Sequence, residues 1–180
     1  MQRCKWVDLK EPIYITYHDQ EWGVPEYEDK KLFELLMLES FQAGLSWLCV
    51  LKKREAFREA FDNFDPEKIA QYTEEKILEL LQNEKIIRSR RKIEAIIQNA
   101  NIFLEIQKEW GTFSKYIWHF TDGKIIKNTE DNVPTTSPLS DTVSQDLRKR
   151  GMKYTGSIII YSYLQAIGII DDHESTCFRY

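Results

Sequence analysis

LLMLESFQAGLSW, residues 35–47, has the pattern of a buried helix that carries one carboxylate among its apolar side chains. Leu35 and Leu36 lie four and three residues before Glu39, and Ala43 lies four residues after it. Because neighbours on one helix face are three or four residues apart, Glu39 shares the apolar face of this segment. An unpaired buried carboxylate costs several kcal/mol, so the position indicates that something compensates for the charge.

The aromatic residues closest to this segment in the sequence indicate what surrounds Glu39. They are Tyr14, Tyr17, Trp22 and Trp47. A carboxylate among aromatic faces is what a pocket for a flat, electron-poor or cationic ring requires. Two alternatives stay open at this stage. Glu39 could pair with a distant Arg or Lys or lie at the rim of the core, and the aromatic residues could be ordinary core residues of a helical bundle.

The composition indicates a globular protein and excludes several classes. The chain has 180 residues, of which 42% are hydrophobic, 30% charged and 13% aromatic, so we expect one domain over residues 1–180. A net charge of −4 does not indicate a nucleic-acid binder, so any such role must rest on local basic patches. No apolar run is long enough to span a membrane, and the N-terminus lacks the apolar core of a signal peptide. We expect a cytoplasmic protein with no membrane partner, monomeric by default.

Helical periodicity and capping residues account for most of the chain, and they predict an all-α bundle of roughly eight or nine helices. The first 25 residues are aromatic and are predicted to be irregular. Helices are expected over residues 29–43, after a cap at Ser46, after Asp65, after a cap at Thr73, over residues 92–110 and 113–120, after a cap at Ser140, and from Gly156. Residues 121–138 are predicted to be a polar loop, and no strands are expected.

Residues near the two ends of the chain form a candidate metal site. Cys4 and His18 lie in the first 25 residues, and His173 and Cys177 lie within residues 171–180 with a spacing that can present both side chains to one ion. Two thiolates and two imidazoles make a tetrahedral set that suits zinc. Four protein ligands leave no position for water, so we expect a structural zinc that packs the two termini together. The alternative is that these residues are unrelated.

A second motif, LRKRGMKYTG, predicts a helix, a hairpin that contains Gly151, and another helix, with the hairpin near residues 147–158. Such a hairpin can turn backbone N–H groups and a helix N-terminus toward a phosphate. Lys149, Arg150 and Lys153 surround it with positive charge, which predicts salt-sensitive binding to a DNA backbone without sequence preference. The alternative is an ordinary helix–helix corner with solvated side chains.

Five segments taken together resemble the 3-methyladenine DNA glycosylase I family of the helix-hairpin-helix superfamily. They are RCKW (3–6), YITYHDQEWGVP (14–25), KKLFELLMLESFQAGLSWLCVLKKRE (30–55), IIRSRRKIEAIIQNA (86–100) and LRKRGMKYTGSIIIYSYLQAIGIIDDH (147–173). They follow the order of the family over nearly the whole chain, and the strings YHDxEWG and QAGLSW are highly specific. The resemblance implies an all-α glycosylase fold with a structural zinc.

The resemblance also implies roles for the residues that match the family's motifs. Glu39 falls on the pocket carboxylate. The aromatic pocket falls on Tyr14, Tyr17, Trp22 and Trp47, and the zinc ligands fall on Cys4, His18, His173 and Cys177. The departures are Lys5 where Gly is frequent, a poor match over residues 121–138, and one hairpin Gly where two are common. Asp172 lies near an Asp that many relatives use, but it adjoins His173, so we assign it no chemistry.

The function that the resemblance implies is DNA repair. The enzyme would hydrolyse the N-glycosidic bond of 3-methyladenine in double-stranded alkylated DNA, flip the base into the aromatic pocket and release it as free 3-methyladenine. The base is cationic while it is attached, so Glu39 could favour it by charge and hydrogen bonding without acting as a strong acid. The pocket segments offer no obvious amine nucleophile, so no strand cleavage is expected. Removal of 3-methylguanine stays open.

Two other classes of function explain part of the sequence. A zinc-stabilised DNA-binding module without catalysis would account for the hairpin and the metal set, but not for Glu39 among aromatic residues. A binder of some other cationic ring would show ligand affinity without any dependence on DNA. Release of free base from methylated DNA separates the three functions.

Overall fold

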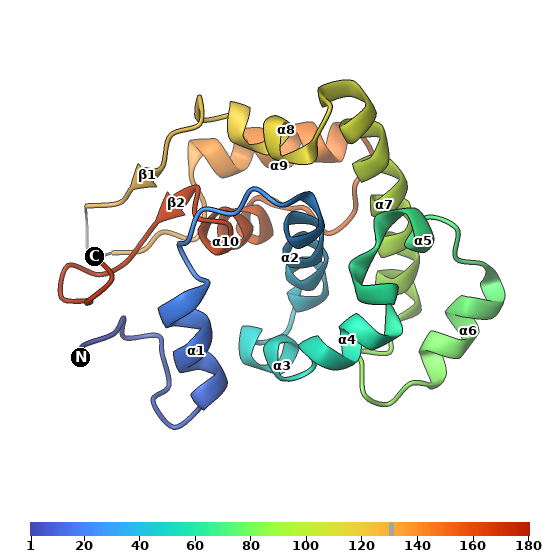
Figure 1. Cartoon of the computed structure of the whole chain (residues 1–180), viewed down its shortest axis with the longest axis horizontal. Helices are drawn as coiled ribbons and strands as arrows, with labels where there is room; N and C mark the ends of the chain where they lie inside the picture. Colours follow the sequence, from blue (N-terminus) through green and yellow to red (C-terminus); the bar gives the residue numbers. More distant parts are fainter. Residues whose placement is uncertain (130–131) are drawn as a thin grey trace.

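The computed structural model describes residues 1–129 and 132–180, which are mostly helical (Figure 1). The helices are α1 (Pro12–Gln20), α2 (Asp29–Gln42), α3 (Trp47–Lys52), α4 (Arg54–Ala60), α5 (Pro66–Ile69), α6 (Glu74–Gln82), α7 (Arg90–Trp110), α8 (Phe113–His119), α9 (Pro138–Lys149) and α10 (Ser157–Ala166), with one 3-10 turn, η1 (Asp62–Phe64). In the part of the chain described, no helix combines the length and apolar character that a bilayer span needs.

Helix α2 is the central element because it is packed on nearly every side. Every residue from 32 to 41 is buried, including the two acids Glu34 and Glu39. Figure 1 shows α2 in the middle of the molecule, with α10 on one side and α4 to α7 on the other. Helix α10 packs directly against α2, and the Tyr163 hydroxyl donates to the main-chain oxygen of Leu32 at 3.0 Å. A helix enclosed in this way cannot rotate to expose a side chain.

Two predicted caps are confirmed by side-chain hydrogen bonds. The Ser46 side chain accepts from the main-chain N–H of Cys49 at the start of α3. The Asp65 carboxylate accepts from the N–H groups of Glu67 and Lys68, and Pro66 occupies the first position of α5. Both residue types satisfy N–H groups that have no partner inside a helix.

Of the two other predicted caps, the one at Ser140 is wrong and the one at Thr73 has the right position but no side-chain hydrogen bond. Helix α9 begins at Pro138 and is capped by Ser137, whereas Ser140 lies one turn inside, where its hydroxyl completes a capping box with Ser137. Both serines are compatible with a cap, and the Pro between them marks the true start because its ring suits the first helical position. Helix α6 begins after Thr73 as predicted, but the Thr73 side chain makes no capping hydrogen bond.

The first 25 residues were predicted to be irregular, and this is wrong for part of the segment, because α1 occupies Pro12–Gln20. Tyr14 and Tyr17 are three residues apart, so they share one face of this helix. That spacing is the signal in the sequence for this helix, but the rest of the segment has only a weak apolar pattern and does not support it. The helix predicted after Ser46 is also divided, since α3 ends at Lys52 and α4 begins at Arg54.

The prediction of no strands is wrong at one place. Strand β1 (Ile126–Lys127) pairs in parallel with β2 (Ile170–Asp171), so part of the predicted polar loop at 121–138 is ordered; residues 130–131 of that loop lie outside the described residues. The main-chain N–H of Ile126 donates to Ile169 at 2.8 Å. A two-residue pairing leaves no periodicity in the sequence, so only the folded chain shows it.

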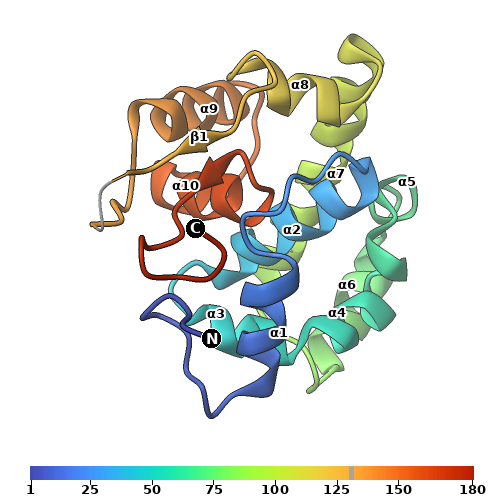
Figure 2. The ribbon, with the colours of Figure 1, turned by 60° about the vertical axis from the view of Figure 1, so that its left-hand side comes forward.

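The two ends of the chain lie on the same side of the molecule, as both ribbon views show (Figures 1 and 2). The main-chain N–H of Phe178 donates to the carbonyl of Gln2 at 2.9 Å, and the N–H of Lys5 donates to Glu174 Oε1 at 2.9 Å. These contacts pack the C-terminal segment after β2 against the segment before α1.

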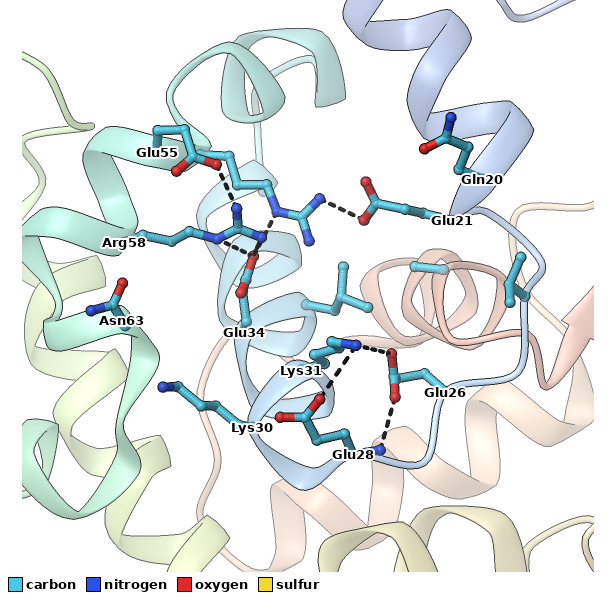
Figure 3. Close-up of a pocket in the computed structure, with 14 residues that line it drawn as sticks. Gln20, Glu21, Glu26, Glu28, Lys30, Lys31, Glu34, Glu55, Arg58 and Asn63 are labelled. Atoms are coloured by element: carbon cyan, nitrogen blue, oxygen red, sulfur yellow. Dashed lines mark hydrogen bonds and ion pairs between the residues drawn. The ribbon is translucent and has the colours of Figure 1, made fainter.

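A charged cavity of about 740 Å³ lies between α2, α4 and the segment that follows α1 (Figure 3). The buried carboxylate in it, Glu34, accepts hydrogen bonds from Arg54 at 2.6 Å and from Arg58 at 2.8 Å. Arg54 also donates to Glu21 at 2.6 Å, which joins α4 to the chain after α1. The charge of Glu34 is therefore compensated within the fold.

Replacing Arg54 by Met should destabilise the protein by about 3 kcal/mol, because the buried Glu34 carboxylate loses one of its two guanidinium partners. Urea denaturation at pH 7 measures the free energy of unfolding. The matched control is Arg88→Met, which removes an exposed pair with Glu84 and should cost less than about 1 kcal/mol. An equal loss of unfolding free energy in the two variants would show that Arg54 stabilises the protein no more than an exposed arginine does.

Candidate active site

A second cavity, of about 550 Å³, lies between the packed chain ends and helices α1, α2, α3 and α10. The structure brings together here all five residues that the sequence proposed for a base pocket, which are Glu39, Tyr14, Tyr17, Trp22 and Trp47. They come from α1, the turn after it, the C-terminal half of α2 and the first residue of α3. Segments distant in the sequence therefore form one aromatic cavity around a carboxyl group.

Glu39 is buried in this cavity without compensation. Only 3% of its surface is exposed, and its Oε2 atom has no hydrogen-bond partner among the described residues. Removal from water disfavours the charged form, and it raises the pKa of Glu39 from 4.5 to about 8. Among the described residues, no Arg or Lys pairs with Glu39, and Glu39 does not lie at an exposed rim of the core. A cation that entered the cavity would favour the ionised carboxylate.

The aromatic walls contribute stacking surfaces and hydrogen-bond donors. The rings of Tyr17 and Trp47 have centroids 5.4 Å apart, and the Trp6 ring lies 5.3 Å from Tyr14 and 5.0 Å from Trp22. The indole N–H groups of Trp6 and Trp47 are buried and unpartnered among the described residues. Buried polar groups are nearly always paired, so these donors indicate that a polar ligand completes the cavity.

Sequence reasoning missed several residues of the cavity, notably Trp6, Ser162 and Gln165. Trp6 lies two residues after the candidate ligand Cys4, in a segment already noted for its family resemblance. Ser162 and Gln165 are polar residues three apart in the otherwise apolar α10. That spacing puts both on one helix face, which is the same signal that singled out Glu39.

Three of the four predicted metal ligands meet beside this cavity. The candidate ligand atoms of Cys4, His18 and Cys177 all lie within 4.8 Å of one another, and all three residues are buried. Cys177 Sγ is 3.4 Å from His18 Nε2, while His18 Nδ1 bonds Asp19 Oδ1 at 2.8 Å. A carboxylate on the second ring nitrogen is the usual support for a metal-bound histidine. These residues could hold a metal ion.

His173, the fourth predicted ligand, lies next to this group but is not part of it. Its ring centroid is 5.3 Å from that of His18. Its Nδ1 bonds Asp171 Oδ1 at 2.7 Å, and its Nε2 is buried without a partner among the described residues. The ring also packs against Gly23, where an added Cβ would lie 2.6 Å from His173 Cε1. Two thiols and two imidazoles, each imidazole bonded to a carboxylate through Nδ1, fit the donor set of zinc.

The four residues predicted to bind DNA lie in the hairpin between α9 and α10. Gly151 has a φ of +101°, a backbone conformation that favours glycine. Lys149 and Lys153 are exposed, whereas the Arg150 guanidinium bonds Asp146 at 2.8 Å and Glu109 at 2.6 Å. Arg150 is thus already engaged inside the protein, and of the residues predicted to bind DNA the two lysines carry the free positive charge.

The hairpin is held rigidly against α7. Gln98 Nε2 donates to the carbonyl of Gly151 at 2.7 Å, and the Asn99 side chain bonds both the N–H and the carbonyl of Lys153 at 2.8 and 2.9 Å. On its other side the hairpin meets the end of α2, where the Ser40 hydroxyl lies 3.5 Å from the carbonyl of Tyr154. The hairpin therefore adjoins the helix end that carries Glu39 into the cavity.

Comparison with known proteins agrees with this geometry. The model of the methyladenine glycosylase family matches residues 6–180. The chain belongs to this family. It is 46% identical over 183 residues to DNA-3-methyladenine glycosylase 1 of Escherichia coli (strain K12), covering 100% of this chain and 97% of the relative. A crystal structure of 3-methyladenine DNA glycosylase I superposes with a TM-score of 0.95 at 48% identity, over 98% of each chain.

A further solved relative is a variant of 3-methyladenine DNA glycosylase I in complex with 3-methyladenine. It superposes with a TM-score of 0.93 at 40% identity, over 99% of this chain and 97% of that chain. Family membership confirms the predicted all-α glycosylase class. It also confirms that the protein is an N-glycosyl hydrolase and not a DNA-binding module without catalysis.

The raised pKa of Glu39 predicts a pH-dependent stability. The folded state binds this proton more tightly than the unfolded state, so the parent loses stability as the pH rises from about 4.5 to about 8. Glu39→Gln has no such proton to lose. Its stability relative to the parent should increase by an amount on the order of 3 kcal/mol between pH 4.5 and pH 8.5. Urea denaturation at the two pH values measures this difference.

Glu105→Gln is the matched control, since Glu105 is an exposed acid on α7. Its stability relative to the parent should stay constant, within about 0.5 kcal/mol, over the same pH range. If the stability of Glu39→Gln relative to the parent also stays constant over this pH range, the carboxyl of Glu39 is solvated or compensated in solution.

Proposed function

We propose that the enzyme releases 3-methyladenine from double-stranded alkylated DNA, with Glu39 and the aromatic cavity as the base-binding site. The observation that carries this proposal is the buried, unpartnered carboxyl of Glu39 inside a cavity walled by flat side chains. The substrate is supported by relatives named 3-methyladenine glycosylases, one of them solved with 3-methyladenine bound.

Recognition follows from charge. A methyl group on N3 makes the attached purine cationic, and a cation in the cavity lowers the pKa of Glu39 and ionises it. The two charges then attract each other in a site with little water, where electrostatic interactions are strong. Stacking on Trp47 and the neighbouring rings adds about 0.5–2 kcal/mol of cation–π attraction. Undamaged adenine is neutral and gains none of this charge stabilisation.

Bond cleavage needs little further help from the protein. The electron pair of the C1′–N9 bond passes to the base, which becomes neutral, and positive charge develops on C1′. Water adds to C1′ and releases a proton to solvent. Because the leaving group is already activated, Glu39 acts by holding the cationic base and not by protonating it. Once the base is neutral its attraction to Glu39 weakens, and this favours release.

We propose hydrolysis without strand cleavage. Strand cleavage requires an amine that attacks C1′, and the amine that lines the cavity is Lys5. Its side chain is 85% exposed, and its Nζ lies 3.9 Å from Glu174 Oε2. Because Lys5 is exposed and lies beside the Glu174 carboxylate, we do not assign it the role of nucleophile.

DNA would approach the face that carries the hairpin. Lys149 and Lys153 would offer charge to the phosphates, whereas the N–H groups of Gly151 and Lys153 are already bonded inside the protein. The hairpin contacts the end of α2 near Ser40, next to Glu39. A nucleotide flipped out of the duplex at this point would bring its base to the cavity while its phosphates stay on the hairpin.

Zinc would hold the cavity together and take no part in the reaction. Cys4, His18, His173 and Cys177 would be its four ligands, with Asp19 and Asp171 supporting the two imidazoles. The ion would supply a cross-link between the two ends of the chain. Cavity residues adjoin three of these ligands in sequence, so the cross-link would keep the aromatic walls in place.

The proposed function is tested by incubating the protein with methylated DNA and identifying the bases released by chromatography. We expect free 3-methyladenine and an intact DNA strand. Glu39→Gln keeps the shape of the side chain and removes its charge, so release should slow by about a hundredfold. Glu105→Gln should match the parent. No free base from the parent would refute the function, and an undiminished rate in Glu39→Gln would refute the role of Glu39.

Elemental analysis after dialysis should find about one zinc per chain. Cys177→Ser should lose the metal and lower the melting temperature, because metal binding and folding are coupled. Cys49→Ser is the control, since Cys49 lies outside the cluster and should leave the zinc content unchanged. A Cys177→Ser variant that keeps zinc and the parental melting temperature would exclude the proposed site.

A further inference from the structure

Gln165 lines the base cavity from α10, and a buried carboxylate holds its amide from behind. Gln165 Nε2 donates to Asp172 Oδ2 at 2.6 Å, and the same oxygen accepts from the Tyr161 hydroxyl at 2.7 Å. Gln165 is 9% exposed and Asp172 is 3% exposed. The mechanism described above uses neither residue, and the other oxygen of Asp172, Oδ1, is buried without a partner among the described residues, which is costly.

The contact with Asp172 determines which end of the amide faces the cavity. A carboxylate accepts hydrogen bonds and does not donate them, so the NH₂ group of Gln165 must point toward Asp172. The opposite orientation would bring two acceptor oxygens together at a buried contact of 2.6 Å. The carbonyl oxygen Oε1 is therefore the polar atom left for the cavity, and no donor among the described residues is paired with it.

We infer that Gln165 is a specificity residue for the reacting base, and that Asp172 is the positioning residue that orients its amide. An adenine carries a hydrogen-bond donor at C6, the exocyclic amino group, whereas a 6-oxo purine carries an acceptor there. Oε1 of Gln165 accepts from the amino group and repels the oxo group. This inference rests on the proposed function: Glu39 selects the positive charge, and Gln165 selects the 6-amino purine among cationic purines.

Gln42 also lines the cavity, and it offers a comparison within the same site. It is half-buried, and its amide makes no hydrogen bond to any residue that the structure describes. A free amide rotates and presents whichever end the ligand requires, so Gln42 does not discriminate between donors and acceptors. A fixed acceptor does discriminate between donors and acceptors, because a ligand with an acceptor at that position leaves two buried acceptors facing each other.

The test compares the binding of two free bases, 3-methyladenine and its 6-oxo counterpart 3-methylhypoxanthine, by quenching of tryptophan fluorescence. The parent should bind 3-methyladenine at least about a hundredfold more tightly. Gln165→Met keeps the size of the side chain and removes the acceptor, so this preference should fall at least about tenfold. Gln42→Met is the matched control and should keep the parental preference.

Variants of Asp172 test the positioning role. Asp172→Leu frees the Gln165 amide to rotate, so the preference should fall as in Gln165→Met. Asp172→Asn retains an oxygen that can accept from Gln165 Nε2, and it should restore the preference. Since Asp172 adjoins His173, metal content and melting temperature are measured for both variants. Weaker binding of both bases at an unchanged ratio would show a merely structural role and would overturn the positioning role.

The outcomes separate this inference from the function on which it rests. If the parent binds 3-methyladenine and Gln165→Met keeps the full preference, the inference is wrong while the proposed function stands. If the parent binds neither base, the inference is wrong, and the release of base from methylated DNA decides separately whether the proposed function stands. A lowered preference in Gln165→Met and Asp172→Leu, with the parental value in Gln42→Met, supports the inference.

Discussion

The burial of Glu39 without a partner is the constraint on which the site depends. Helix α2 can hold the carboxyl there because residues 32 to 41 are buried all around, so no rotation returns it to water. Glu34 lies on the same helix and is also buried, but Arg54 and Arg58 compensate its charge. Two acids on one helix therefore differ in environment, because the fold compensates the charge of Glu34, whereas Glu39 has no partner among the described residues and would be ionised by the cation that we propose as its ligand.

The chain ends form the walls of the cavity, and they contain little regular structure to hold them. Trp6 lies two residues from Cys4, Tyr17 precedes His18, and the segment after β2 packs against the N-terminal segment. Contacts between irregular segments cost conformational entropy that a small packed surface barely offsets. A metal bound by residues from both ends would stabilise these segments beside the aromatic cavity.

In the proposed function, two packed helices divide recognition of the base between charge and hydrogen bonding. Glu39 comes from α2, and Gln165 comes from α10 with its amide oriented by Asp172. Helices α2 and α10 pack directly against each other, so the two side chains are placed by one rigid unit. The hairpin before α10 also contacts the end of α2. The proposed binding of the DNA backbone and the proposed reading of the base would thus depend on the same pair of helices.

Local spacing in the sequence was enough to determine the helical class, the burial of Glu39 and the caps at Ser46 and Asp65, because these features depend on neighbours within a turn. The family strings added the aromatic pocket. Only the tertiary structure decided that Arg150 is engaged by acids from α7 and α9, that β1 pairs with β2, and that the Gln165 amide faces Asp172. Each of these contacts joins groups from segments that are distant in the sequence. The spacing of residues along one helix does not indicate which side chains from other segments will pack against that helix.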